Sequence, residues 1–294
     1  MSIRTGYMGL ADIGGTNVRC NSFTVNPNQD ILFYNHVIGL KDTIPTDNST
    51  KTEDLGLTYA NVQRKIWRPS PISITGGISF PATKKNLSNI FDLARYANYF
   101  DTNFTYFCHA TEKNTREFID CRINSFDFSI VSGDIVNISL DVACKNVKFD
   151  LNKYISYTEA EKLITWDKVP VKIENASFTT NNMIIQGFNF KINNNLQTIY
   201  TTTSATNTTE SLLPTDIRVG MQEVTGSVAI YYDRGYEFVP IDLNTVANIK
   251  ADMGDAGINL DMTVVFKPHQ FEGNAGPLLA QLPFVCVDYS FKKN

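Results

Sequence analysis

The sequence predicts a mainly β protein made of two tandem modules, each an antiparallel sheet with one α-helix against it. Asn, Thr and Ser are abundant while charged residues make up only 19%, which is typical of strand-rich surfaces. Several stretches alternate apolar and polar residues, as strands with one solvated face do. A third observation is an internal repeat, because residues 225–243 follow the pattern of residues 75–93 at an offset of 150.

Each copy of this repeat reads as a turn, an alternating strand and a closing apolar-Asp-Leu step. The copies share Thr-Gly at positions 75–76 and 225–226, and Asp-Leu at positions 92–93 and 242–243. A chain of 294 residues is also long enough for two domains. We therefore expect a boundary near residue 165, which gives modules of residues 1–165 and 166–294.

Composition excludes several classes of protein. The net charge is −4 and the pI is about 5.4, so no basic field is present to hold nucleic acid tightly. The five cysteines are odd in number and no pair has CxxC spacing, which argues against a disulfide framework or a structural zinc site. The first residues lack the apolar segment of a signal peptide, and no run approaches the roughly 18 apolar residues of a membrane span. We expect a soluble protein made in a reducing cytoplasm, with no cofactor and no contact with a membrane.

Residues 12–19 contain the sharpest local motif. Their order, Asp-Ile-Gly-Gly-Thr-Asn-Val-Arg, resembles the first phosphate loop of sugar kinases with the actin-like ATPase fold. In that alternative, Asp12 would work with the metal and the amides of Gly14 and Gly15 would approach the phosphates. The second phosphate loop, the Asn-Asp base and the adenosine loop of those kinases are missing, so a β-turn at the two glycines is the favoured interpretation.

The next stretch predicts a hairpin that recurs in the second half. A strand at residues 18–25 and a short strand from residue 31 have counterparts at residues 184–192 and 198–200, which gives an offset of 167. A polar segment follows in each half, at residues 40–65 and 201–214. Loops this long are usually functional or disordered, so we expect both to contact a neighbouring subunit.

One helix is predicted at residues 87–97, where Leu87, Ile90, Phe91 and Ala94 share a face. Asn86 precedes them and can cap the helix. The second copy offers a shorter equivalent at residues 242–249.

The clearest hairpin spans residues 121–144 and turns at residues 132–134. Its apolar and polar positions alternate on both arms, which predicts one buried and one wet face. Residues 258–266 show the same alternation in the second copy, and residues 283–291 form a last strand.

Candidate chemical sites are weak. His36, His109 and His269 lie in separate segments, and none has a metal-ligand partner at the usual spacing. Residues 252–257 combine two Asp with glycines but lack the ligand pattern of a calcium loop, so a hairpin turn is the better interpretation. Trp67 and Trp166 are expected to be packing residues, and no catalytic group is predicted.

The order of these features resembles the tail tube (major tail) proteins of long-tailed bacteriophages, in the form with a duplicated tube domain. The resemblance rests on residues 5–19 running into residues 29–31, the Thr-Gly strand, the helix, and residues 121–136. It implies a β-sandwich or barrel-like module with a flanking helix, and Gly14-Gly15 as a hairpin turn. Another β-rich virion module, such as a baseplate, decoration or adhesin protein, is an alternative.

The resemblance also implies an assembly in which rings stack into a tube in the virion tail, after synthesis in the host bacterial cytoplasm. Inner sheets join edge to edge around a lumen through which DNA is ejected without tight binding. Two modules per chain would make a ring of three chains pseudo-hexameric. The implied partners are other copies, tape measure, terminator, and baseplate or sheath proteins. The candidate lumen-facing residues are Asn124, Asp127, Ser129, Asn137, Ser139, Asp141, Asn259, Asp261 and Thr263.

Overall fold

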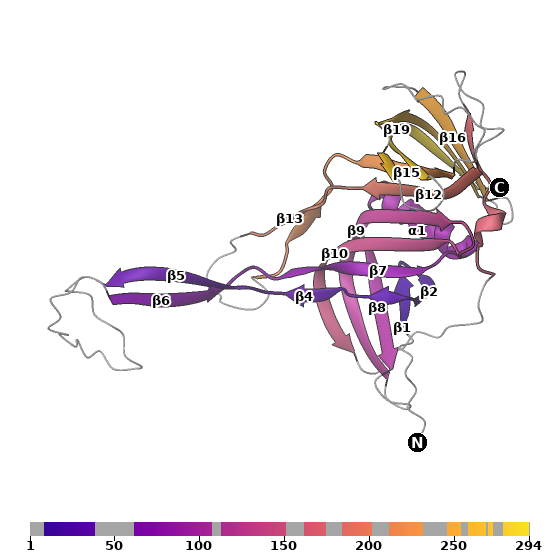
Figure 1. The fold of residues 1–294 in the computed structure, drawn as a ribbon. Helices are drawn as coiled ribbons and strands as arrows, with labels where there is room; N and C mark the ends of the chain where they lie inside the picture. Colours follow the sequence, from indigo (N-terminus) through magenta and orange to yellow (C-terminus); the bar gives the residue numbers. More distant parts are fainter. Residues whose placement is uncertain are drawn as a thin grey trace.

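The computed structural model describes residues 9–38, 62–107, 113–150, 162–174, 184–201, 212–231, 246–253, 258–268, 270–272 and 279–293. These residues form a mainly β fold with antiparallel pairing throughout, as the sequence predicts, and they include one α-helix (Figure 1). Within them, no helix is long and apolar enough to cross a membrane.

One large sheet dominates the structure and follows the order β11-β16-β17-β19-β15-β12-β9-β10-β7-β3. Strands β1, β2, β4, β8 and β18 branch from this path. The bounds in the first half are β1 Gly9–Ile13, β2 Thr16–Cys20, β3 Ser22–Phe23, β4 Asn26–Asn28, β5 Ile31–Ile38, β6 Val62–Pro69, β7 Ser73–Pro81, α1 Lys84–Tyr96, β8 Phe100–Phe107, β9 Lys113–Val131 and β10 Asn137–Asp150. In the second half they are η1 Trp166–Lys168, β11 Val171–Glu174, β12 Ile184–Asn193, β13 Gln197–Ile199, β14 Asp216–Arg218, β15 Glu223–Tyr231, β16 Val246–Met253, β17 Ile258–Phe266, β18 Gln270–Glu272 and β19 Leu279–Lys293.

The two halves of the sheet repeat one strand order. In the first half the neighbours run β1-β8-β9-β10-β7-β3/β4, and in the second they run β11-β16-β17-β19-β15-β12. The repeated Thr-Gly steps lie on β7 and β15 at matching places in this order. The boundary near residue 165 stays a prediction, although η1 begins there.

Strand β9 belongs to two parts of the sheet. Its first half, residues 113–121, pairs with β8, and its last part, residues 125–131, pairs with β12 on the same edge. Strand β10 accompanies β9 along its other edge, with a register shift beside Asp141. The join between the halves is therefore continuous backbone pairing rather than a flexible linker (Figure 1).

The strand pairings give a different offset between the first hairpin and its counterpart in the second half from the one that was predicted. Phe23 lies opposite Ile78 and Phe188 opposite Val228, while Ile78 and Val228 occupy the same position in their repeats. The offset is therefore 165 rather than 167. The prediction was wrong by two positions because a shift of two keeps every side chain on the same face and preserves the alternation.

Helix α1 begins earlier than predicted. Thr83 is its N-cap, and Asn86 occupies the third helical position of a capping box rather than the cap itself. The Asn86 side-chain oxygen accepts from the Thr83 backbone N–H at 2.7 Å. Leu87, Ile90 and Phe91 are buried, so the predicted apolar face does pack on the sheet.

The helix expected at residues 242–249 is not found where the structure describes this stretch. Residues 246–249 belong to β16, and residues 242–245 lie outside the described residues. Strand β16 contains β-branched Val246 and Ile249 and pairs with β17 along its whole length. Pairing with two neighbours outweighs the weak helical pattern.

Gly14 and Gly15 form the two-residue turn between β1 and β2, with φ of 56° and 84°. Two positive φ values in succession are what a tight hairpin turn requires, and glycine adopts them without strain. Asp12 lies on β1, opposite Asn17 on one side and Asn103 on the other. The motif thus has the hairpin role rather than the geometry of a phosphate loop.

Each half also carries a two-stranded ribbon between its first strand and its Thr-Gly strand. Strands β5 and β6 form one ribbon, which projects away from the body, and β13 and β14 form the other (Figure 1). Much of each predicted polar loop, residues 39–61 and 202–211, lies outside the described residues.

Candidate functional site

A continuous polar face crosses the join between the halves. We define this polar face by three rows of residues that lie directly opposite one another on successive strands. The central row is Ser22, Ser79, Ser139, Asp127, Lys191, Thr225 and Val285. The flanking rows are Pro81, Asn137, Ser129, Asn189, Ser227 and Pro283, and Gly77, Asp141, Ser125, Asn193 and Glu223.

The opposite face of the same strands is apolar. Its rows include Ile78, Leu140, Phe126, Ile192 and Val224, and all of them are buried. Helix α1 covers this side, since Phe91 lies 5.6 Å from Phe126 and 6.2 Å from Phe190 between ring centroids. The sheet therefore has an unambiguous core face and an unambiguous polar face.

Side chains on the polar face are short. The rows are mostly Ser, Thr, Asn and Gly, with the three carboxylates of Asp127, Asp141 and Glu223 and the single ammonium of Lys191. None of the residues in the rows is Arg. Such a surface presents weak hydrogen-bonding groups and a slightly negative field, so it offers little to hold a polyanion.

Asp127 occupies the centre of the polar face at the join. Its carboxylate accepts a hydrogen bond of 2.5 Å from the Asn189 side chain, and Lys191 lies directly opposite. Burial raises the pKa of Asp127, and this effect is larger than the lowering by Asn189 and Lys191. The contact fastens β9 of the first half to β12 of the second.

The six predicted lumen-facing residues of the first half share this region, with one exception. Asp127, Ser129, Asn137, Ser139 and Asp141 lie in the rows, and Ser139 and Asp141 are exposed. Asn124 lies at the register shift, where its side-chain oxygen accepts from the Leu196 backbone N–H at 2.9 Å. Asn124 therefore connects β9 to the turn after β12.

The three residues predicted for the second half are not brought together with the first set. Asn259, Asp261 and Thr263 lie on β17 where it pairs with β16, which matches the part of β9 that pairs with β8. There, Thr263 donates to Asn248 at 3.2 Å and Lys292 lies 3.8 Å from Asp261. By register, the counterparts of Asp127 and Ser139 are instead Gln270 and Gln281.

A buried amide that the sequence did not reveal reinforces the join. Asn194 is fully buried, and its side-chain nitrogen donates to the backbone oxygens of Ala94 and Ile123 at 2.9 and 2.8 Å. Its side-chain oxygen accepts from Gln222 at 2.7 Å. One side chain thus connects α1, β9 and the segment before β15. Its neighbours in a run of three Asn gave no signal of burial.

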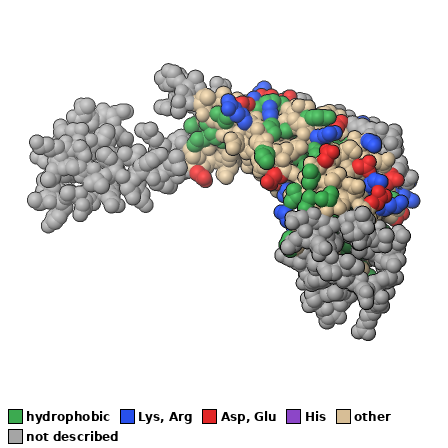
Figure 2. Space-filling view, turned by 90° about the horizontal axis from the view of Figure 1, so that it is seen from above, with side chains coloured by type: hydrophobic (Ala, Val, Ile, Leu, Met, Phe, Trp, Pro, Cys, Tyr) green, Lys and Arg blue, Asp and Glu red, His purple; other side chains and the backbone are tan. Residues whose placement is uncertain are grey.

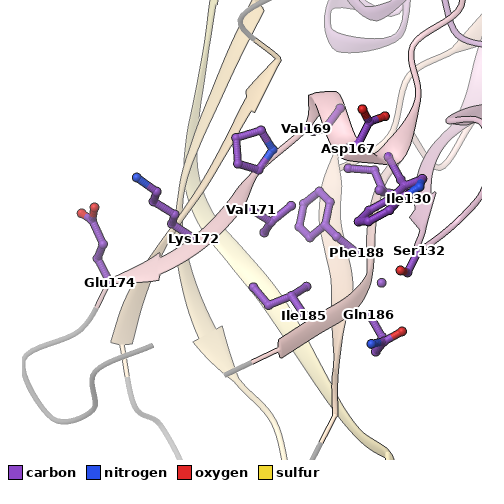
Figure 3. Close-up of a pocket in the computed structure, with 13 residues that line it drawn as sticks. Ile130, Ser132, Asp167, Val169, Val171, Lys172, Glu174, Ile185, Gln186 and Phe188 are labelled. Atoms are coloured by element: carbon purple, nitrogen blue, oxygen red, sulfur yellow. The ribbon is translucent and has the colours of Figure 1, made fainter. Parts of the chain in front are cut away.

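A hollow of about 670 Å³ opens at one end of the join (Figure 3). Val171 from β11 and Ile185 and Phe188 from β12 point toward it, while Lys172 and Glu174 lie at its outer end. Trp166 lines it and is 43% exposed, so this residue is not the core packing residue that we expected. The residues lining the hollow include no His or Cys.

The other predicted candidates add no chemical site in the part of the chain that the structure describes. No group of three metal-ligating side chains occurs among those residues. His109 and His269 lie outside them, as do residues 254–257, and the side chains of His36 and Trp67 are not described. Lys and Arg side chains intermingle with Asp and Glu on the surface seen in Figure 2.

A family model described as phage tail tube protein matches residues 46–286, which is most of the chain. A search of curated proteins finds no match.

Proposed function

Since this chain belongs to the phage tail tube protein family and is therefore a structural protein of the virion tail, we propose that it forms rings that stack into a DNA conduit. Family membership implies assembly with other copies and with other tail proteins. The proposal adds that three chains close each ring and that the polar face lines the channel.

The observation that carries the proposal is the polar face itself. It crosses the join without interruption, its side chains are short, and the opposite side is sealed by core residues and α1. A conduit for DNA needs a smooth wall without clusters of cations, because each Lys or Arg that neutralises a phosphate would retard the strand. Asp127, Ser129, Asn137, Ser139 and Asp141 are the residues we place on the channel wall.

The repeated strand order supports a ring of three chains. Each half supplies one unit of the sheet, so residues 1–165 and 166–294 act as two equivalent modules. Six modules then surround the channel in a pseudo-hexameric ring. Heterologous contacts of this kind close when the rotation between units divides a full turn.

The two ribbons support contacts beyond the ring. An isolated two-stranded ribbon is marginally stable in water, and the β5–β6 ribbon extends away from the sheet (Figure 1). We assign it to a contact with a neighbouring subunit, such as one in the next ring. Shortening the ribbon by removing residues 34–66 should leave rings intact but prevent their stacking, whereas normal tubes would refute this role.

Electron microscopy of the purified protein tests the assembly. Rings or tubes with a central channel are expected. A chain that stays monomeric at high concentration would overturn the proposal.

A charge reversal tests which face lines the channel. Ser139 and Asp141 are exposed members of the polar face, so Ser139→Lys with Asp141→Lys should allow assembly yet slow DNA ejection from the phage. The control is Asp92→Lys with Asp167→Lys, which also adds two lysines but places them on α1 and η1, away from the polar face. Ejection at the normal rate from fully assembled Ser139/Asp141 variant tails would refute the assignment.

A further inference from the structure

The two halves of the chain are joined by pairing between β9 and β12. Strand β12, which ends the sheet order of the second half, pairs with the last part of β9, and seven residue pairs fix its register. Counterparts of both elements occur elsewhere in the large sheet: β18 branches from β19, β3 ends the path, and β4 pairs with β7 beside it. Among the described residues, their counterparts pair only within their own half.

Strand β18 is the counterpart of the last part of β9. Gln270, Phe271 and Glu272 pair with β19 in the same sense in which Asp127, Phe128 and Ser129 pair with β10. The two triplets also share the order polar, aromatic, polar. Strand β9 continues through the register shift at Asn124. At the corresponding place the second half has Lys267 and Pro268, and two strands, β17 and β18, correspond there to the single strand β9. Proline cannot donate to a ladder, which explains the interruption.

Strands β3 and β4 are together the counterpart of β12. Asn26 lies opposite Thr75, as Lys191 lies opposite Thr225, and Phe23 lies opposite Ile78, as Phe188 lies opposite Val228. The edge also keeps the alternation of β12, because Thr24 and Asn26 are exposed while Val25 is buried.

We propose that β18 of one chain pairs antiparallel with β3–β4 of the next copy, in the register of the internal join. This deepens the proposed ring assembly and rests on it. Within the chain, Asp127 lies opposite Lys191 and Ser129 lies opposite Asn189. The corresponding pairs between two copies are Gln270 with Asn26 and Glu272 with Thr24. Phe271 then takes the register position opposite Val25, as Phe128 lies opposite Phe190.

The pairing satisfies both edges at once. Unpaired strand edges expose rows of backbone donors and acceptors, and a second copy that brings the complementary edge covers them. No like charges meet in this register, since Glu272 faces a threonine and Gln270 faces an asparagine. A slip of one residue would turn the polar positions into the core, so the alternation fixes the register strongly.

Cysteine pairs test this register in assembled protein. The double variant Thr24→Cys with Glu272→Cys places two thiols directly opposite each other. Their Cβ separation of about 4.5–5.5 Å is close to the value of about 3.5–4.5 Å that a disulfide needs. Mild oxidation of the rings should convert most of the monomer band on a non-reducing gel into a ladder that ends at three chains. Single variants Thr24→Cys and Glu272→Cys should give no ladder.

Two controls make the result specific. Ser22→Cys with Glu272→Cys lies on the same face but two residues out of register, at a diagonal distance of about 7–8 Å, and should link poorly. Ser129→Cys with Asn189→Cys copies the pair within one chain and should close an internal disulfide in monomers and rings alike.

The outcomes separate the two proposals. If rings are visible by electron microscopy and the Ser22 pair links better than the Thr24 pair, the register is wrong while the ring survives. If rings are visible and neither pair links, β18 is not the edge that is used. If no rings form under any condition, the proposed assembly itself fails.

Discussion

Replacing Gly76 by alanine should damage the protein far more than the same change at its neighbour Gly77. Gly76 is the second residue of the repeated Thr-Gly step on β7. A Cβ built there would lie 2.5 Å from the Thr24 backbone oxygen and 2.6 Å from the Val25 Cα. These are backbone atoms of the edge that contains β3 and β4, so no side chain can rotate away to make room.

The magnitude follows from the contacts. Overpacking that shifts backbone costs typically about 1–3 kcal/mol. Because the contacts at Gly76 are well inside van der Waals distance, we expect a loss of about 2 kcal/mol, which corresponds to a melting temperature lower by about 3 °C for a chain of this size. Gly77 meets nothing closer than 3.5 Å, so Gly77→Ala should be neutral or slightly stabilising.

Urea unfolding of both variants measures the difference. Gly226, the counterpart of Gly76 on β15, offers an independent repetition, because its added Cβ would lie 2.2 Å from the Asn189 backbone oxygen and 2.3 Å from the Phe284 ring. Gly226→Ala should therefore resemble Gly76→Ala. Equal midpoints for Gly76→Ala and Gly77→Ala would show that close approach of the first strand is not why the step contains glycine.

Three further changes test the join and its surroundings. Asn194→Ala should lower the free energy of unfolding in urea by about 1–3 kcal/mol, because it leaves two buried backbone oxygens without their donor. Asn193→Ala should lower it less. Equal losses would contradict the role of the buried Asn194 amide. Tyr99 donates to Asp216 at 2.7 Å and lowers the pKa of that carboxyl, so its stabilisation is present at neutral pH and lost as pH falls through the lowered pKa. Tyr99→Phe should thus lower the melting temperature more at neutral pH than in acid, where only the hydrogen bonds of the hydroxyl with the Ile217 backbone are lost. A deficit of the same size at both pH values would refute the linkage. The pKa of Asp127 is raised, so this carboxyl lowers stability as pH rises from the ordinary Asp pKa through the raised value. Asp127→Asn should remove this loss of stability. An unchanged pH dependence of unfolding would argue against burial as the cause of the raised pKa.

Local patterns predicted the elements that depend on neighbours in sequence. Alternation at Phe126, Phe128 and Ile130 was sufficient to predict the β9–β10 hairpin, because one buried face fixes a period of two. The face of α1 was predicted for the same reason at a period of 3.6. All of the predicted polar residues of that hairpin except Asn124 lie together on the polar face, whose role in the channel stays a prediction.

Pairings between distant segments could not be predicted in this way. Nothing in the sequence of β9 says that residues 125–131 change partner from β8 to β12, because both neighbours suit the same alternation. The second-half candidates were therefore aligned with the wrong part of β9. Pro268 was the available signal, since it separates β17 from β18 and shows where the long strand is divided.

The division of β9 between two neighbours also bears on how the chain folds and melts. Asp127 and Lys191 are 64 positions apart, so we expect β12 to find its register after the β9–β10 hairpin, whose partners are closer in sequence, has formed. The second half would then fold against strand β9 of the first half. Separation of β12 from β9 would expose apolar surface of both halves. Calorimetry should accordingly record a single cooperative transition for the whole chain, where two units joined by a tether would melt separately.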